Sequence, residues 1–135
     1  MQSRGATLME VIVISLVVAV TAAVAIPNLI AMDQRAKNGI TTDNAGILQD
    51  AAEQYRNDHG VYPTFVLPLI HRLPGHRPFK NAFDGEHVEP RYGRTPGSIV
   101  YFGLADGSNY TILCIGAKGD TLLKLTRLRP YIIGS

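Results

Sequence analysis

The stretch Val11–Met32, VIVISLVVAVTAAVAIPNLIAM, decides the fold, because its 22 residues contain no charge between Glu10 and Asp33. A helix needs about 20 consecutive apolar residues to cross a bilayer. The stretch therefore predicts a membrane-spanning helix. A secretory signal peptide is the alternative, but its apolar core is usually about 7–15 residues and ends in a small-residue cleavage site. The greater length here favours a retained anchor.

The remaining composition excludes several classes of protein. A chain of 135 residues has room for one compact domain. With 46% hydrophobic and 18% charged residues it is too apolar to be disordered, and a net charge of +2 does not by itself imply nucleic acid. The single Cys114 excludes an internal disulfide. Because no nucleophile signature is present either, the sequence predicts a protein that is not an enzyme and uses no cofactor.

Two residues do not fit a plain anchor. Glu10 lies at the edge of the apolar stretch, where a carboxylate is costly unless paired and by default marks function; the alternative is a side chain that rests among the headgroups. Pro27 lacks a backbone N–H and crowds the carbonyl of Ala23, which predicts a helix kink; the alternative is an ordinary tolerated membrane proline. Arg4 precedes the stretch, so the N-terminus is expected in the cytoplasm and the C-terminus outside.

These residues carry a resemblance to a known family. The segment Gly5-Ala6-Thr7-Leu8-Met9-Glu10, followed by the apolar helix and Ala25-Ile26-Pro27-Asn28-Leu29, resembles the start of type IV pilins and of the pseudopilins of type II secretion systems. The resemblance covers roughly the first 30 residues. Two positions depart from the family pattern: Ala6 replaces the usual phenylalanine, and Ala19 lies where a mid-helix glycine is common.

The resemblance implies how the N-terminus is processed and used. A prepilin peptidase would cut between Gly5 and Ala6, and the new amine of Ala6 would be methylated. Residues 1–5 would then be a leader and residues 6–32 the transmembrane and assembly helix. In a filament, Glu10 would neutralise the Ala6 amine of a neighbouring subunit and set its register, since an unpaired charge inside an apolar bundle costs several kcal/mol.

The resemblance also implies a function and a location. The main hypothesis is a structural subunit of a type IV pilus-like filament, or fimbrium, that polymerises with copies of itself for adhesion, motility or DNA uptake. A pseudopilin of a type II secretion system and a DNA-binding minor pilin are the alternatives. The expected partners are the prepilin peptidase and an inner-membrane assembly platform. The precursor is expected in the inner membrane as a single-pass protein, and the mature subunit in a filament at the cell surface.

Beyond Asp33 the chain has the pattern of a small α+β domain. Residues 33–59 predict an amphipathic helix that ends near Asp58 and Gly60, with apolar side chains on one face: Ile40, Ile47, Leu48, Ala51, Ala52 and Tyr55. Residues 60–97 contain six prolines and predict a connecting loop with little regular structure, apart from a short paired segment around Glu86–Tyr92.

Residues 98–135 predict an antiparallel sheet of three or four strands that packs on the helix. Ser98–Gly103, Asn109–Ile115 and Asp120–Thr126 are rich in β-branched and aromatic residues and are separated by glycine-containing turns. A fourth, edge strand is expected at Arg129–Ile133. The helix residues Ile47, Leu48, Ala51 and Tyr55 are expected to face Val100, Phe102, Ile112, Cys114 or Leu123, with Cys114 as a buried, unreactive thiol.

Two clusters in the loop could carry chemistry. His71, His76 and His87 with Asp84 and Glu86 lack the spacing of a metal-ligand set, and the sequence predicts solvated side chains and no metal. Residues 61–135 carry nine Lys and Arg against five Asp and Glu. A solvated basic face explains this excess, and a DNA-contacting surface is the alternative, formed by Arg72, Arg77, Lys80, Arg91 and Arg94.

Overall fold

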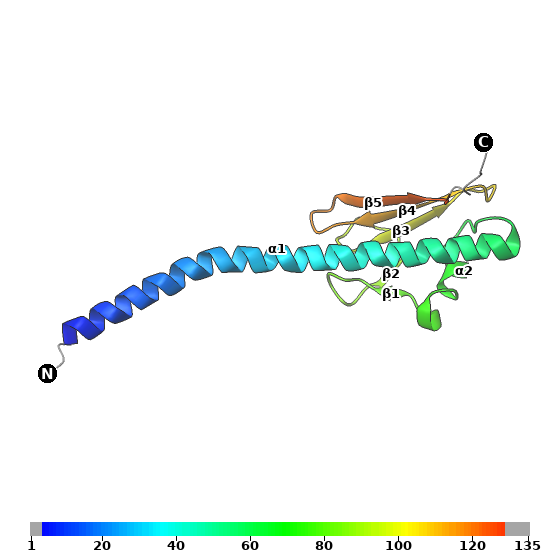
Figure 1. Ribbon diagram of the computed structural model, residues 1–135. Coiled ribbons are helices and arrows are strands. Elements are labelled where there is room, and N and C mark those ends of the chain that lie inside the picture. Colours follow the sequence, from blue (N-terminus) through cyan, green and yellow to red (C-terminus); the bar gives the residue numbers. More distant parts are fainter. Residues whose placement is uncertain (1–3, 129–135) are drawn as a thin grey trace, which may run out of the picture. The chain divides into compact units, whose positions relative to one another are not determined.

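The computed structural model describes residues 4–128 of the chain, which divides into two compact units. The first unit is Met1–Arg35 and the second is Ala36–Ser135. Helix α1 (Arg4–His59) begins in the first unit and ends in the second, and the α-helix continues without interruption through Pro27 (Figure 1). Gly60, with φ of 80°, follows its last residue and donates its N–H to the carbonyl of Arg56.

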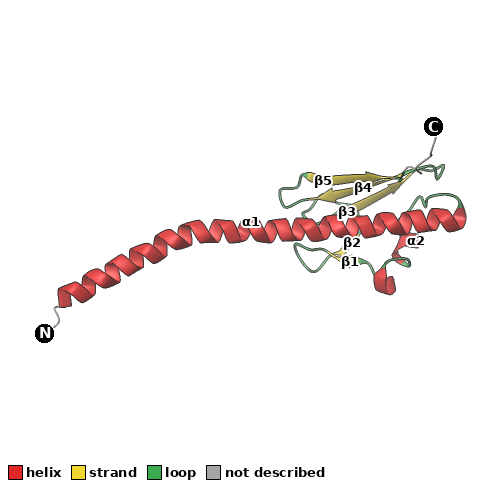
Figure 2. Cartoon of the chain, viewed as in Figure 1, coloured by secondary structure: helices red, strands yellow, loops and turns green. Residues whose placement is uncertain are grey.

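The sheet elements follow helix α1 and lie in the second unit (Figure 2). Strands β3 (Ile99–Gly103), β4 (Tyr110–Ile115) and β5 (Thr121–Thr126) form an antiparallel sheet in the order β3-β4-β5. Each begins one residue after its predicted start. The α+β fold, a long helix with a small antiparallel sheet, is therefore confirmed. The expected edge strand Arg129–Ile133 lies outside the described residues.

The loop between helix and sheet contains more regular structure than predicted. It holds the short helix α2 (Leu67–Ile70), a 3₁₀ turn (Pro74–His76), and the two-residue strands β1 (Phe79–Lys80) and β2 (Val88–Glu89), which pair with each other. β2 lies inside the paired segment expected around Glu86–Tyr92. Its partner β1 was not expected, because two residues are too few to leave a periodic pattern in the sequence.

The core lies between the second half of α1 and one face of the β3–β5 sheet. Leu48 and Ala52 of α1, and Ile112 and Cys114 of β4, are fully buried. The other buried apolar members of the core come from α1, the loop and the sheet: Ala45, Ala51, Tyr62, Leu69, Leu73, Ile99, Tyr101 and Tyr110. Ile47, Tyr55 and Leu123 are partly buried and pack against them. The predicted packing of helix on sheet is thus confirmed.

Three positions predicted for the buried faces were wrong. Val100 and Phe102 were expected to face the helix, but Ile99 and Tyr101 do so, and Phe102 is 47% exposed. Because residues 99–102 are all apolar, their sequence contains no alternation that would show which face of the strand is inside. Ile40, expected on the buried helix face, is 50% exposed.

Candidate functional site

The first unit contains the first half of α1, whose large apolar side chains are exposed in the structure of residues 4–128. Fifteen large apolar residues between Leu8 and Met32 are each at least 52% exposed. By length and composition, this helix is the one candidate membrane span among the described residues. Burying exposed apolar surface is worth roughly 25 cal/mol per Å². A surface this extensive therefore needs lipid or other helices around it.

The polar residues of this unit lie on helix α1. The hydroxyl of Thr21 donates to the carbonyl of Val17 at 2.7 Å, so its polar group is satisfied inside the helix. Glu10 is exposed and shares a shallow concave surface with Met9, Val13 and Ile14. The predicted cleavage and methylation site, Gly5 and Ala6, lies at the start of α1. No contact in the structure tests the roles of Gly5, Ala6, Glu10 or Pro27, which stay predictions.

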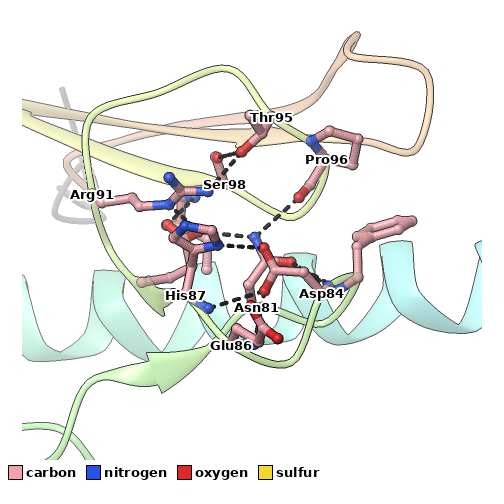
Figure 3. Close-up of polar contacts among 11 residues, drawn as sticks. Asn81, Asp84, Glu86, His87, Arg91, Thr95, Pro96 and Ser98 are labelled. Carbon is pink, nitrogen blue, oxygen red and sulfur yellow. Dashed lines mark hydrogen bonds and ion pairs between the residues drawn. The ribbon is translucent and has the colours of Figure 1, made fainter.

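The loop holds a polar cluster that the sequence did not indicate (Figure 3). Glu89, only 1% exposed, accepts hydrogen bonds from the amide of Asn81 at 2.9 Å, from Nε of Arg91 at 3.0 Å and from the backbone N–H of Ile99 at 3.2 Å. The Asn81 amide also donates to the carbonyl of Pro96 at 3.0 Å. This cluster fastens β2 to the start of β3. It is fully paired, which indicates a structural role.

The loop residues that the sequence analysis weighed as metal ligands, and predicted to be solvated instead, lie in separate groups. Asp84 and His87 form an exposed pair at 2.6 Å. The backbone N–H of Glu86, the His87 ring and the His87 backbone N–H all bind the Asp84 carboxylate, which lowers its pKa to about 2. His76 instead contacts the carbonyl of His71. No group of three or more candidate metal ligands occurs in residues 4–128.

Two of the five cations proposed for DNA contact are engaged within the fold. Arg72 pairs with Asp58 at 2.6 Å and lies over the ring of Tyr55. Arg91 pairs with Glu89. Arg77, Lys80 and Arg94 are exposed. The DNA-contacting surface therefore stays a prediction that rests on these three residues.

A second carboxylate missed by the sequence analysis joins three parts of the second unit. Glu53 of α1 accepts hydrogen bonds from the hydroxyls of Tyr62 and Tyr110 at 2.9 and 2.8 Å and from the backbone N–H of Leu128 at 2.9 Å.

Cys114 is buried as expected, and burial raises the pKa of its thiol to about 11. It is therefore a packing residue.

These features define the class of pilin-like proteins: the first half of the long helix is apolar and unpartnered, and its second half is amphipathic and packs on a small antiparallel sheet. Comparison with known proteins narrows the class. The chain is 28% identical over 123 residues to the type II secretion system core protein G of Vibrio cholerae, a match that covers 88% of this chain and 84% of that protein. It is 30% identical to the proteins of the same name in Escherichia coli K12 and Klebsiella pneumoniae, covering 88% of this chain and 85% and 80% of theirs. The chain belongs to the type II secretion system core protein G family. No protein-family model and no solved structure matches it.

Proposed function

We propose that this chain is a structural subunit of a pilus-like filament, and that the filament is part of a type II secretion system. The observation that carries the proposal is the unpartnered apolar surface between Leu8 and Met32. Family membership favours the secretion machine over a surface pilus, since the relatives are named as its core proteins. Assembly rather than catalysis is the proposed activity.

The proposed mechanism begins in the inner membrane, with the second unit on the outer side. A prepilin peptidase cuts after Gly5, and the Ala6 amine is methylated. As subunits leave the bilayer, their helices form the filament core. There the Glu10 carboxylate loses its access to water, and it pairs with the Ala6 amine of a neighbour. A subunit out of register would leave both charges unpaired.

The experiment compares Glu10→Gln with the control Glu86→Gln, which neutralises an exposed carboxylate of the loop. Each variant is expressed in cells that contain the secretion machine but lack the wild-type subunit. The yield of filaments and the amount of membrane-bound subunit are then measured. Glu10→Gln should lower filament yield by about tenfold, because an ionic partner of the amine is lost. The level of processed, membrane-bound subunit should stay unchanged, and Glu86→Gln should assemble normally.

Normal filaments from Glu10→Gln would contradict the register role of Glu10. If the wild-type chain forms no filament with the machine present, the filament proposal itself fails. N-terminal mass analysis of the same membranes tests the processing step, for which the expected first residue is a methylated Ala6. A chain that keeps Met1, or one cut beyond Ile26, would exclude the proposed processing.

A further inference from the structure

We propose that residues 129–135, Arg-Pro-Tyr-Ile-Ile-Gly-Ser, dock on an apolar patch at the end of the second unit where α1 ends. The patch consists of Val61, Phe65, Leu104 and Leu128, and we call it the turn patch because it surrounds the turn between β3 and β4. The inference goes beyond the proposed filament and does not depend on it, since it concerns one chain by itself.

The turn patch gathers large apolar side chains that are about half exposed or more: Phe65 at 68%, Leu128 at 53%, Leu104 at 52% and Val61 at 46%. The Cβ of Val61 lies 2.7 Å from the point where a Cβ on Gly107 of the turn would be. The N–H of Gly103, next to Leu104, donates to the carbonyl of Thr64, next to Phe65, at 3.3 Å. Apolar side chains that gather on a surface in this way indicate a place that another segment covers.

Strand β5 points toward the same end of the second unit as the C-terminus of α1 (Figure 1). The residues after β5 are fixed beside the turn. The backbone N–H of Arg127 donates to the side-chain oxygen of Asn109 at 3.1 Å, and its guanidinium donates to the carbonyl of Ser108 at 3.4 Å. Residues 129–135 therefore start at the turn patch, because Leu128 is itself a member of it.

Two hydrogen bonds to α1 give the direction in which the chain leaves β5. The Gln49 amide donates to the carbonyl of Thr126 at 2.8 Å, and the backbone N–H of Leu128 donates to Glu53 at 2.9 Å. Four residues of α-helix rise about 6 Å, which two residues of extended chain also cover. The chain thus runs alongside α1 toward the helix C-terminus, and Val61 follows that terminus by two residues.

The sheet offers no continuation for residues 129–135. The register places Tyr110, the first residue of β4, opposite Arg127, so β4 has no further strand residue to pair with the chain beyond that point. Pro130 has no N–H to donate to a neighbouring strand. It also keeps the preceding residue, Arg129, extended. The segment is therefore expected to leave the sheet as extended chain.

The composition of the segment matches the patch. Tyr131, Ile132 and Ile133 are consecutive large apolar residues. Five extended residues span about 17 Å, enough for these side chains to cross a patch that begins at Leu128. Because Leu128 binds Glu53 of α1, the segment starts on the helix side of the sheet, away from its outer face. The position, direction and chemistry of the segment therefore favour it as the occupant of the turn patch.

The first experiment is a cysteine cross-link within the full chain in detergent, with oxidised glutathione as the oxidant. Val61→Cys with Ile132→Cys tests docking, and Lys124→Cys with Ile132→Cys is the matched control. Lys124 is exposed and is closer to Ile132 along the chain than Val61 is. Docking should make the disulfide to position 61 form about tenfold faster than the disulfide to position 124, because it raises the effective concentration of one thiol at the other. Cys114 is buried and should not interfere.

The second experiment measures trypsin cleavage after Arg127 in the same detergent. A docked segment protects this bond, and trypsin does not cut between Arg129 and Pro130. Ile132→Asp with Ile133→Asp should raise the cleavage rate about tenfold by releasing the segment. Phe65→Asp should act in the same direction from the patch side. The control Val88→Asp places a carboxylate at an exposed apolar residue outside the patch and should leave the rate unchanged.

Equal cross-linking rates for the two cysteine pairs, or a faster reaction at position 124, would overturn the inference. Disulfide-linked dimers without an internal disulfide would also overturn it, because a second copy would then cover the patch. An unchanged cleavage rate in the double aspartate variant would contradict docking independently of the cysteines. All of these measurements use the isolated subunit, so a chain that forms no filament would contradict the proposed function and leave this inference standing.

Discussion

Glu89 is the only buried charged residue among those that the structure describes. Its carboxylate accepts hydrogen bonds from three donors, and these offset the cost of removing the charge from water. Removing the carboxylate would leave one N–H of the Asn81 amide and the N–H of Ile99 without an acceptor, and Arg91 without its counter-ion. The cost of such an unpaired group is large because a buried donor without an acceptor carries the full penalty of having lost its hydrogen bonds to water.

We predict that Glu89→Ala lowers the free energy of unfolding by about 3 kcal/mol, the usual effect of breaking a buried ion pair from one side. Glu86→Ala is the matched control, since it removes an exposed glutamate from the same loop and should change stability by less than about 0.5 kcal/mol. Urea unfolding followed by circular dichroism measures both. Equal stability of the two variants would show that Glu89 does not fasten the loop to the sheet.

At the scale of elements, the glycines of the second unit divide into two kinds. Gly46, inside α1, has no atom within 4 Å of the place where a Cβ would be. Gly103, at the end of β3, has the carbonyl of Pro63 and the Cα of Thr64 in that place, because the chain before α2 crosses the strand there. Gly46 therefore weakens its helix although no neighbouring atom requires a glycine there. Gly103 is required because two backbone segments approach each other closely at this position.

We predict opposite effects when each glycine is replaced by alanine. Gly46→Ala should raise the free energy of unfolding by about 0.5–1 kcal/mol through higher helix propensity. Gly103→Ala should lower it by about 2 kcal/mol or more, because Pro63 or β3 must shift to make room. Thermal unfolding of the detergent-solubilised subunit compares the two. If Gly46→Ala instead lowered the free energy of unfolding, another part of the isolated chain would have to lie against this position of α1, which would contradict the prediction.

At the scale of the whole second unit, Glu53 joins three parts of the fold. It lies on α1 and binds Tyr62, which follows the C-terminus of the helix, and Tyr110 of the sheet. The hydroxyls of Tyr62 and Tyr110 both donate to its carboxylate. Burial, and then the hydrogen bond and the negative charge of Glu53, raise the pKa of both tyrosines above the ordinary value of 10. Burial likewise raises the pKa of Tyr101, whose hydroxyl donates to the carbonyl of Pro63 at 2.7 Å.

These directions predict how stability depends on alkaline pH. A group whose pKa is higher in the folded state than in the unfolded state contributes its full stability below the unfolded pKa, and this contribution is lost as pH rises. The urea midpoint should therefore be flat from pH 7 to 9 and fall above pH 10. Tyr62→Phe with Tyr110→Phe should flatten the fall, while Tyr92→Phe, at an exposed ring, should not. An unchanged slope in the double variant would contradict a folded-state origin of these shifts.

The sequence by itself determined the elements whose signals are local. An uncharged run of 22 residues specifies an apolar helix regardless of what surrounds it, and the spacing of Gly5, Glu10 and Pro27 was sufficient to indicate the pilin-like class. The three main strands were placed within one residue of their observed starts, because β-rich segments separated by turn residues are also local patterns.

Only the tertiary structure decided which residues meet. Glu53 and Tyr110 are 57 positions apart, and nothing in the residues around either one indicates a hydrogen bond between them. The four apolar residues of β3 are compatible with either face of the sheet, and packing against α1 selected Ile99 and Tyr101 for the inside. That choice left Val100 and Phe102 on the outer face, where they line an apolar groove. Long-range contacts of this kind depend on the shape of the assembled core, which periodicity along the chain does not contain.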